Sequence, residues 1–259
     1  MNQMTEESRI RTLQLVINSK DREDYSTTSS SEFTVKLNNP INFDILAYGL
    51  ESACIPKTNY NVSGAAFQIT DSVGLKTVNI PSGNYTITSL TTELQNLLNA
   101  LGVDTYIVVS STTTMKITIT SSFAGFTLNP NASNYPFVTM LGFNNSTVYN
   151  SVAGVLLAPK VFDLAGIKNL YIKVSQLTEY MRDTKNLSSN FKVDFGCGYG
   201  TIVYFANENK YLQYYTTAQN HVRRTDKFDV RLVDEMGNNV DLNGSDWSFV
   251  LRFLTRDLY

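Results

Sequence analysis

The chain has 259 residues, enough for one large domain or two modest ones with a core that needs no disulfide or metal. It is 42% hydrophobic and 17% charged and contains 15 Tyr and 14 Phe, which favours an all-β globular protein and argues against disorder. The net charge is −2 and the basic residues are spread along the chain, so the composition argues against nucleic-acid binding. The N-terminus lacks the apolar segment of a signal peptide, and no apolar run approaches the ~20 residues of a membrane helix. We therefore expect a protein that is not secreted and has no membrane-spanning segment.

Three strands are predicted before residue 60. Apolar and polar residues alternate at 13–18 and again at 32–37, which is the period of a strand with one buried face. The run Asn38-Asn39-Pro40 is predicted to end the second strand, because these residues favour turns and proline has no backbone N–H for a sheet. A third, largely apolar strand at 44–55 is predicted to end at Pro56 for the same reason.

Five further strands are predicted after residue 168, at 169–177, 201–207, 211–217, 227–235 and 247–254. The last strand ends close to the C-terminus and carries on one face Trp247, Phe249, Leu251 and Phe253. So apolar a final segment favours a strand that is paired on both sides. We therefore expect the C-terminal strand to lie inside a sheet.

The middle of the chain, residues 64–158, has a different pattern. It contains short strands at 67–70 and 76–80, an apparent hairpin at 105–121, and a loop-rich stretch at 123–150. The sequence therefore predicts three regions: an N-terminal arm at 1–12, a body at 13–63 and 159–259, and an insertion subdomain at 64–158 between the third and fourth body strands.

One helix is predicted within this insertion. A helical period relates its apolar residues, which are Leu90, Leu94, Leu97, Leu98 and Leu101. Ser89 is a plausible N-cap, and Gly102 is placed for the C-cap. One apolar face requires one surface to pack on, so we expect the helix to cover a small sheet built by its own flanking strands.

Eight body strands without alternating helices favour an antiparallel β-sandwich, because a parallel sheet would need crossover helices. Eight strands in two Greek keys describe a jelly roll, but an immunoglobulin-like sandwich or a lectin would share the composition. The pattern alone leaves these three architectures open.

The residues that could carry chemistry are few. His221 is the single histidine, and a catalytic triad or a zinc site would need partners that its neighbourhood does not offer. Cys54 and Cys197 are predicted to be buried thiols, with a disulfide as the less favoured alternative. The glycine-rich run at 195–200 lacks the Lys-Ser/Thr ending of a phosphate loop, so it is interpreted as a tight approach to a strand.

Two clusters of charged residues could bind a metal ion or a partner. Asp21, Glu23 and Asp24 could hold Ca²⁺, but a solvated turn is the favoured interpretation. Arg223 and Arg224 belong to the densest basic spot, close to His221, and suit contacts with a neighbouring subunit better than a nucleic-acid groove. We therefore expect no enzyme activity, no metal and no cofactor.

Several short segments, in order along almost the whole chain, resemble one protein family. They are "INSKDRE" at 17–23, "EFTVKLNNPI" at 32–41, "LESACIPKTNYNV" at 50–62, "IPSGNYTITSLTTELQNLL" at 80–98, "LGF" at 141–143 and "WSFVLRF" at 247–253. The combination resembles the penton, or minor capsid, proteins of virophages and related polinton-like viruses. These are single jelly rolls at the five-fold vertices of icosahedral shells that are built mainly from double jelly-roll trimers.

The resemblance implies a structural role in a virion. It implies a homopentamer at the capsid vertex that contacts major capsid protein trimers and is assembled inside the host cell. It further implies that the N-terminal arm points toward the shell interior, with Arg9 and Arg11 as its ionic contacts. The subunit contact in such a ring would be head to tail, with two different patches on each subunit.

Tyrosines outside the alternating core are candidate interface anchors, because Tyr combines a large contact area with a polar tip. They are Tyr48, Tyr60, Tyr214, Tyr215 and Tyr259. Packing within the subunit is the alternative for each of them.

Two other functions remain open from the sequence. The first is a trimeric fibre head or a carbohydrate- or receptor-binding module, in which loops of the 103–158 region would hold a sugar against Tyr135 and Phe137. The second is a hydrolase on a sandwich fold, which would need paired acids on facing strands, whereas most candidate carboxylates here lie in turns.

Overall fold

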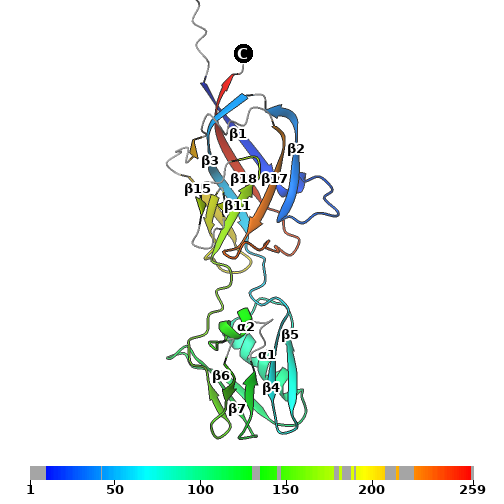
Figure 1. Cartoon of the computed structure of the whole chain (residues 1–259), viewed down its shortest axis with the longest axis vertical. Coiled ribbons are helices and arrows are strands. Elements are labelled where there is room, and N and C mark those ends of the chain that lie inside the picture. The colour runs from blue at the N-terminus through cyan, green and yellow to red at the C-terminus, as the bar shows by residue number, and fades with distance from the viewer. Residues whose placement is uncertain are drawn as a thin grey trace, which may run out of the picture. The chain divides into compact units, whose positions relative to one another are not determined.

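The computed structural model describes residues 10–41, 43–129, 135–144, 147–177, 181–182, 188–189, 191–207, 214–215 and 225–257. These residues form two compact units (Figure 1). The first, called the body from here on, contains the described residues up to Asn59 and from Ile167 onward, and the second, the insertion, is Tyr60–Gly166. The sequence places the insertion at 64–158. The structure sets wider limits, because Val62, Phe162 and Leu164 pack in the insertion core.

The body contains two antiparallel sheets. The first has the order β1-β18-β3-β15, with β1 (Ile10–Asn18), β18 (Ser248–Asp257), β3 (Phe43–Pro56) and β15 (Ile202–Ala206), and β16 (Tyr214–Tyr215) also pairs with β3. The second has the order β14-β11-β17-β2, with β14 (Phe191–Asp194), β11 (Asn169–Val174), β17 (Thr225–Val233) and β2 (Glu32–Ile41). The other described elements of the body are the 3₁₀ helix η1 (Ser19–Asp21) and a small pair, β12 (Met181–Arg182) and β13 (Ser188–Ser189).

Strand pairing in the body is nested. The first strand pairs with the last and the second with the last but one, and the series continues inward as β1–β18, β2–β17, β3–β15 and β11–β14. Two further pairings, β18–β3 and β17–β11, join these four pairs into the two sheets. A long antiparallel hairpin wrapped onto itself in this way is a jelly roll. The predicted fold class, an all-β eight-stranded jelly roll with an inserted α+β subdomain, is confirmed.

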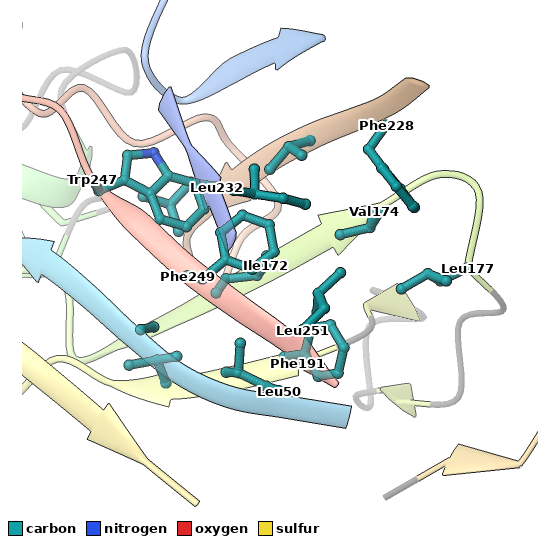
Figure 2. Packing of buried hydrophobic residues seen from close by; sticks show 14 of the residues in the cluster. Leu50, Ile172, Val174, Leu177, Phe191, Phe228, Leu232, Trp247, Phe249 and Leu251 are labelled. Carbon is teal, nitrogen blue, oxygen red and sulfur yellow. The ribbon is translucent and has the colours of Figure 1, made fainter. Parts of the chain in front are cut away.

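The core of the body fills the space between the two sheets. Figure 2 shows Trp247, Phe249 and Leu251 from the β18 segment facing side chains of β11 and β17. Trp247 stacks on Phe249 with ring centroids 5.1 Å apart, and its indole Nε1 donates to the Ser30 carbonyl at 2.6 Å. The prediction that the C-terminal strand lies inside a sheet is confirmed, because β18 is paired with β1 on one side and β3 on the other.

Two strand predictions for the second half of the chain are corrected. The four residues of β14 were missed, because so short a run followed by glycines gives little periodic signal. The segment 211–217 is predicted as a separate body strand. Its described part, β16, pairs with Ala47 and Tyr48 of β3, nearer the start of β3 than the residues that pair with β15. The two sheets therefore contain eight main strands, as predicted, but β14 takes the place of the predicted strand at 211–217.

Two strand limits in the first half also differ. Strand β1 begins at Ile10, inside the arm predicted at 1–12. Strand β2 continues through Pro40 to Ile41 instead of ending at Asn38. Strand β2 is an edge strand, so it has a neighbour on one side only, and its pairing with β17 is irregular at this end. The sheet therefore tolerates the missing N–H of Pro40.

The insertion contains two smaller antiparallel sheets and two helices. The four-stranded sheet has the order β5-β4-β8-β9, with β5 (Leu75–Ile80), β4 (Ala65–Thr70), β8 (Thr127–Asn129) and β9 (Tyr149–Asn150). The three-stranded sheet has the order β10-β7-β6, with β10 (Val155–Leu157), β7 (Ile117–Ser121) and β6 (Tyr106–Ser110). The helices are α1 (Ile87–Asn99) and α2 (Tyr135–Met140), and α2 lies in a stretch that the sequence predicts to be loop.

Helix α1 buries Leu90, Leu94 and Leu98 and contacts its flanking strands β5 and β6, as predicted, but these strands belong to two different sheets and not to one. Its N-cap is Thr86 instead of Ser89. The Thr86 hydroxyl accepts from the Ser89 N–H, and the Ser89 hydroxyl accepts from the Thr86 N–H, which is a capping box. The C-cap is Ala100, and Gly102 follows in the left-handed region with φ +81°.

Candidate assembly surfaces

The structure describes part of the predicted contact set. Arg11 lies in β1 opposite Thr255, Tyr60 is 41% exposed at the start of the insertion, and Tyr214 and Tyr215 form β16. The following predicted contact residues lie outside the described residues: Arg9, His221, Arg223, Arg224 and Tyr259. The described members are therefore divided between the two units.

Two predicted aromatic contact residues are wrong. Tyr48 is completely buried in the body, where its ring meets Phe191 edge to face at 6.1 Å, so it packs within the subunit. Phe137 is 3% exposed and stacks on Phe67 at 6.2 Å in the insertion core, so it offers no face to a sugar. Neither lies in a clear alternating pattern, because the pairing of β3 with β18 shifts register on both sides of residues 47–50 and Phe137 lies in a short helix.

The outer face of the first sheet carries exposed apolar side chains. Its cross-strand rows are Val16–Val250–Ser52–Ala206 and Asn18–Ser248–Cys54–Tyr204. Val16 is 67% exposed, Tyr204 76% and Ile202 49%. Because Val203 and Phe205 pack against the core, the residues between them must point outward, so the alternation in 202–206 is a signal that could have located Tyr204.

A polar cluster lies beside these apolar residues on the same face. Arg252 binds the Glu51 carboxylate through two nitrogens, at 2.6 and 3.2 Å, and the Gln14 amide donates to both oxygens of the same carboxylate at 2.8 and 2.7 Å. The cluster joins β1, β3 and β18 side by side. This face therefore has a fixed polar part and an apolar part without cover in the described chain.

The outer face of the second sheet is dominated by charge. Arg231 and Glu32 approach to 3.5 Å, and Lys192 lies 3.1 Å from Asp194. Asp229 accepts from the Thr34 hydroxyl at 2.6 Å and from the Gln176 amide at 2.7 Å. The Thr34 hydrogen bond is the main reason why the pKa of Asp229 is below its usual value. The two outer faces of the body thus differ in chemistry.

A buried ion pair fixes the loop between β1 and β2. Arg22 lies 2.7 Å from Asp246, and their side chains are 6% and 11% exposed. Asp246 also accepts from Ser19 Oγ at 2.7 Å and Tyr25 OH at 3.0 Å, and the Arg22 guanidinium lies 3.9 Å from the Tyr25 ring centroid. Burial alone would raise the pKa of Asp246, but these hydrogen bonds and the charge of Arg22 keep it below its usual value.

A second buried cation lies where β3 ends. Lys57 is 7% exposed and donates from Nζ to the Phe195 carbonyl at 2.8 Å and the Ile167 carbonyl at 3.4 Å. Burial lowers the pKa of this amine. Lys57 thus ties together three segments of the body: the end of β3, the start of the return from the insertion, and the loop after β14.

Asn61 performs the matching task inside the insertion. Its amide donates to the carbonyls of Tyr85 at 2.8 Å and Leu164 at 3.2 Å, and its oxygen accepts from the Tyr85 N–H at 2.9 Å. The incoming chain, the outgoing chain and the segment before α1 are thereby joined. Lys57 thus joins segments within the body, and Asn61 does so within the insertion.

Residues considered for chemistry form no reactive arrangement in the described ranges. Cys54 and Cys197 are free thiols and are half-buried, not buried as predicted. No set of three or more His, Cys, Asp and Glu side chains placed to bind a metal occurs among the described residues. None of the described helices is long and apolar enough to cross a membrane.

Comparisons with known proteins find similarity among solved structures. No family model and no curated protein matches the sequence. One of the similar solved structures is the selenomethionine-labelled penton protein of mavirus, which is 10% identical to this chain. The similarity covers 95% of this chain and 99% of that protein, with a TM-score of 0.49.

Proposed function

We propose that this chain is a structural capsid protein: a penton subunit that forms a ring of five at the vertex of an icosahedral virus shell. It would act by shape and contact, without catalytic turnover, cofactor or nucleic-acid recognition. Its partners would be other copies of itself and the trimers of the major capsid protein, and its location the virion.

The jelly-roll body with an insertion between its third and fourth strands is the observation that carries the proposal. This is the architecture implied by the resemblance of the sequence to virophage pentons. The nested pairing also distinguishes the body from the immunoglobulin-like sandwich, which has a different strand order.

The segments that carry the resemblance also contain the residues that make fold-specific contacts. The segment at 17–23 supplies Arg22 of the buried ion pair, and the segment at 50–62 supplies Lys57 and Asn61. The segment at 80–98 supplies the capping box, and the one at 247–253 supplies Trp247. The segments that carry the resemblance are therefore also segments that hold this fold together.

Head-to-tail contact in a ring uses two different patches of each subunit. The outer face of the first sheet is suited to be one of them, because Val16, Ile202 and Tyr204 are exposed beside the fixed Gln14–Glu51–Arg252 cluster. Tyrosine at the centre of a contact commonly contributes much of its binding free energy. We expect this face to be covered in the assembled ring.

The experiment is to measure the solution mass of the full chain by light scattering over a range of concentration and salt. A species whose mass is a multiple of five times 29.0 kDa supports the proposal. A trimer would instead favour a fibre head. A monomer under all conditions would require rings to form when the major capsid protein is added, and failure of that mixture would refute the proposal.

A matched pair of variants tests the face. Tyr204→Glu places a charge on the outer face of the first sheet, whereas Lys36→Glu changes charge on the outer face of the second. We expect Tyr204→Glu to weaken ring formation at least about tenfold, the scale of one buried anchor lost. Equal weakening by both variants would mean that this face is not the specific contact.

A further inference from the structure

Charge is distributed very unevenly between the two units. Residues 60–166 contain seven charged residues in 107, whereas the other 152 residues contain 37. The seven are Asp71, Lys76, Glu93, Asp104, Lys116, Lys160 and Asp163. Depletion of charge is a feature of the central part of protein interfaces. In this respect the insertion resembles the centre of a protein interface.

The three-stranded sheet of the insertion has one face without cover from any described residue. Its inner face contributes Tyr106, Val108, Ile117, Ile119 and Leu156 to the core. Its other face, called the apolar face from here on, consists of two cross-strand rows: Ile107–Thr120–Val155 and Val109–Thr118–Leu157. Its four aliphatic side chains are about half exposed: Ile107 is 53% exposed, Val155 43%, Val109 50% and Leu157 56%. No charged residue belongs to these rows.

The neighbouring edge of this sheet is already protected. The amide of Asn99 in α1 donates to the Tyr106 carbonyl at 3.1 Å and its oxygen accepts from the Tyr106 N–H at 2.6 Å. Gln95, one helical turn earlier, accepts from the Val108 N–H at 3.0 Å. These amides take the place of a neighbouring strand along β6. A partner is therefore expected on the face of the sheet, not as an added strand at this edge.

The chemistry of the apolar face restricts its partner. A charged or strongly polar surface docked against it would lose hydration without gaining hydrogen bonds. The outer face of the four-stranded sheet in the same unit is such a polar surface, because it presents Gln68, Thr70, Thr77, Asn79 and Asn129. A second copy of the apolar face leaves fewer groups unsatisfied than that polar sheet would, and two sheets pack face to face through aliphatic rows of this kind.

The size of the apolar face agrees with a modest contact. Four half-exposed aliphatic side chains give a patch on the order of 300–400 Å², similar to the largest patch on a typical monomer. A standard interface buries about 800 Å² on each partner, so this patch would be the centre of a contact with a polar rim. Lys116 and Lys160, next to β7 and β10 in the chain, are placed to belong to that rim.

We propose that the apolar face of the insertion binds the same face of a second copy of this chain, sheet against sheet about a two-fold axis. The proposal does not rest on the capsid role. A two-fold contact joins pairs of subunits and a ring of five cannot pair all its members internally, so in the proposed ring the contact would join two rings.

The test uses the full chain and compares variants of the two sheets of the insertion. Val109→Glu combined with Leu157→Glu places two charges in one row of the apolar face. The control is Thr77→Glu combined with Asn79→Glu, which places two charges on exposed positions of β5 in the other sheet. Light scattering gives the mass of each protein, and circular dichroism confirms that each has folded.

The masses separate this inference from the capsid proposal. If both hold, the wild type and the control reach ten subunits and the Glu variant stops at five. If only the inference holds, the wild type and the control are dimers and the Glu variant is a monomer. A wild type that reaches five subunits or stays a monomer, or a Glu variant that associates like the control, overturns the inference.

A cysteine at the centre of the face gives a second readout that does not depend on tolerance of charge. Thr118→Cys is made in a chain in which Cys54→Ser and Cys197→Ser have removed the native thiols. Because β7 is the central strand and Thr118 lies near the expected two-fold axis, mild oxidation should link two copies in most of the protein. Thr77→Cys in the same background should remain unlinked. Equal linking of the two variants, or none in Thr118→Cys, would also overturn the inference.

Discussion

The body and the insertion are both β-rich, but they satisfy their polar groups differently. In the body, buried charges have partners: Arg22 with Asp246, and Lys57 with two carbonyls. Buried polar atoms without a hydrogen-bond partner among the described residues occur in both units: Asn59 Oδ1 in the body, and Asp71 Oδ2 and Tyr106 OH in the insertion. The other oxygen of Asp71 accepts from the Val73 and Gly74 N–H groups within one turn. The difference lies in charge: buried charged side chains join distant segments of the body, whereas the neutral side chain of Asn61 does so in the insertion. Four sets of substitutions, two in each unit, test this difference through the unfolding free energy.

The largest effect is expected for Trp247→Ala in the body. The change removes a 97% buried indole, its stacking on Phe249 and its hydrogen bond to Ser30. Loss of a large buried aromatic side chain costs about 3–5 kcal/mol of unfolding free energy. Chemical denaturation followed by circular dichroism measures it. A loss below about 1 kcal/mol would show that the region between the sheets tolerates a cavity and that the network is less specific than we infer.

Removing Arg22 tests whether the buried ion pair of the body behaves as a unit. Arg22→Met leaves the Asp246 carboxylate buried, and breaking such a pair costs about 3 kcal/mol, the lower part of the usual range, because Ser19 and Tyr25 still donate to it. Because the pKa of Asp246 is lower in the folded protein, its stabilisation is present above the unfolded pKa near 3.8 and is lost as pH falls through the folded value.

The pH dependence of this effect provides the control. We expect the difference in unfolding free energy between wild type and Asp246→Asn to be constant near neutral pH and to shrink below about pH 4. Denaturation curves at several pH values measure this difference. A difference that grew as the solution became more acidic would contradict the assigned direction of the pKa shift.

A smaller effect is expected from the helix cap of the insertion. Thr86→Ala removes the side-chain oxygen that accepts from the Ser89 N–H, at a cost of about 1 kcal/mol. Ser89→Ala removes only the reciprocal bond and should cost less. Hydrogen exchange of the first turn of α1 gives the local readout. If Ser89→Ala were the more damaging change, the N-cap would be Ser89, as the sequence alone predicts.

The smallest effect is expected from Tyr106→Phe in the insertion. Burial raises the pKa of Tyr106 to about 12, and its hydroxyl lies near Ser121 without a well-aligned hydrogen bond to any described residue. Removal of an unsatisfied buried hydroxyl is nearly neutral or stabilising, so we expect a change between about 0 and +1 kcal/mol in unfolding free energy. A destabilisation above about 1 kcal/mol would mean that this hydroxyl has a partner, such as a buried water, and that the two units are more alike than we infer.

Much of the fold could be predicted from sequence because alternation is a strong signal in long strands. β17 and β18 were located in this way, since each alternates over nine or ten residues. β14 and α2, with four and six residues, were missed because neither completes enough periods to be distinguished from a loop. Nested pairing was not predictable from periodicity, because a strand pattern does not say which other strand is its neighbour.

The candidate surfaces were less predictable than the fold. A tyrosine outside a simple alternating pattern can be buried, as Tyr48 is, because the bulges in the β3–β18 pairing change which face a residue occupies. Tyr204 and the apolar face were not predicted although their strands alternate. Alternation shows that a strand has two different faces, but it does not show which face is exposed. Which face is buried depends on the partner sheet, and that information is in the tertiary structure.

The nested pairing has a consequence for synthesis of the chain on the ribosome. Strand β18 lies between β1 and β3 and pairs with both, yet it follows them in the chain by about 190 residues or more. The first sheet therefore cannot close until β18 has been made, whereas every strand pairing inside the insertion joins residues at most 61 positions apart, the separation of Gln68 and Asn129. The insertion can fold while the two halves of the body wait for one another, so the earliest folded part of the nascent protein is the part encoded in its middle.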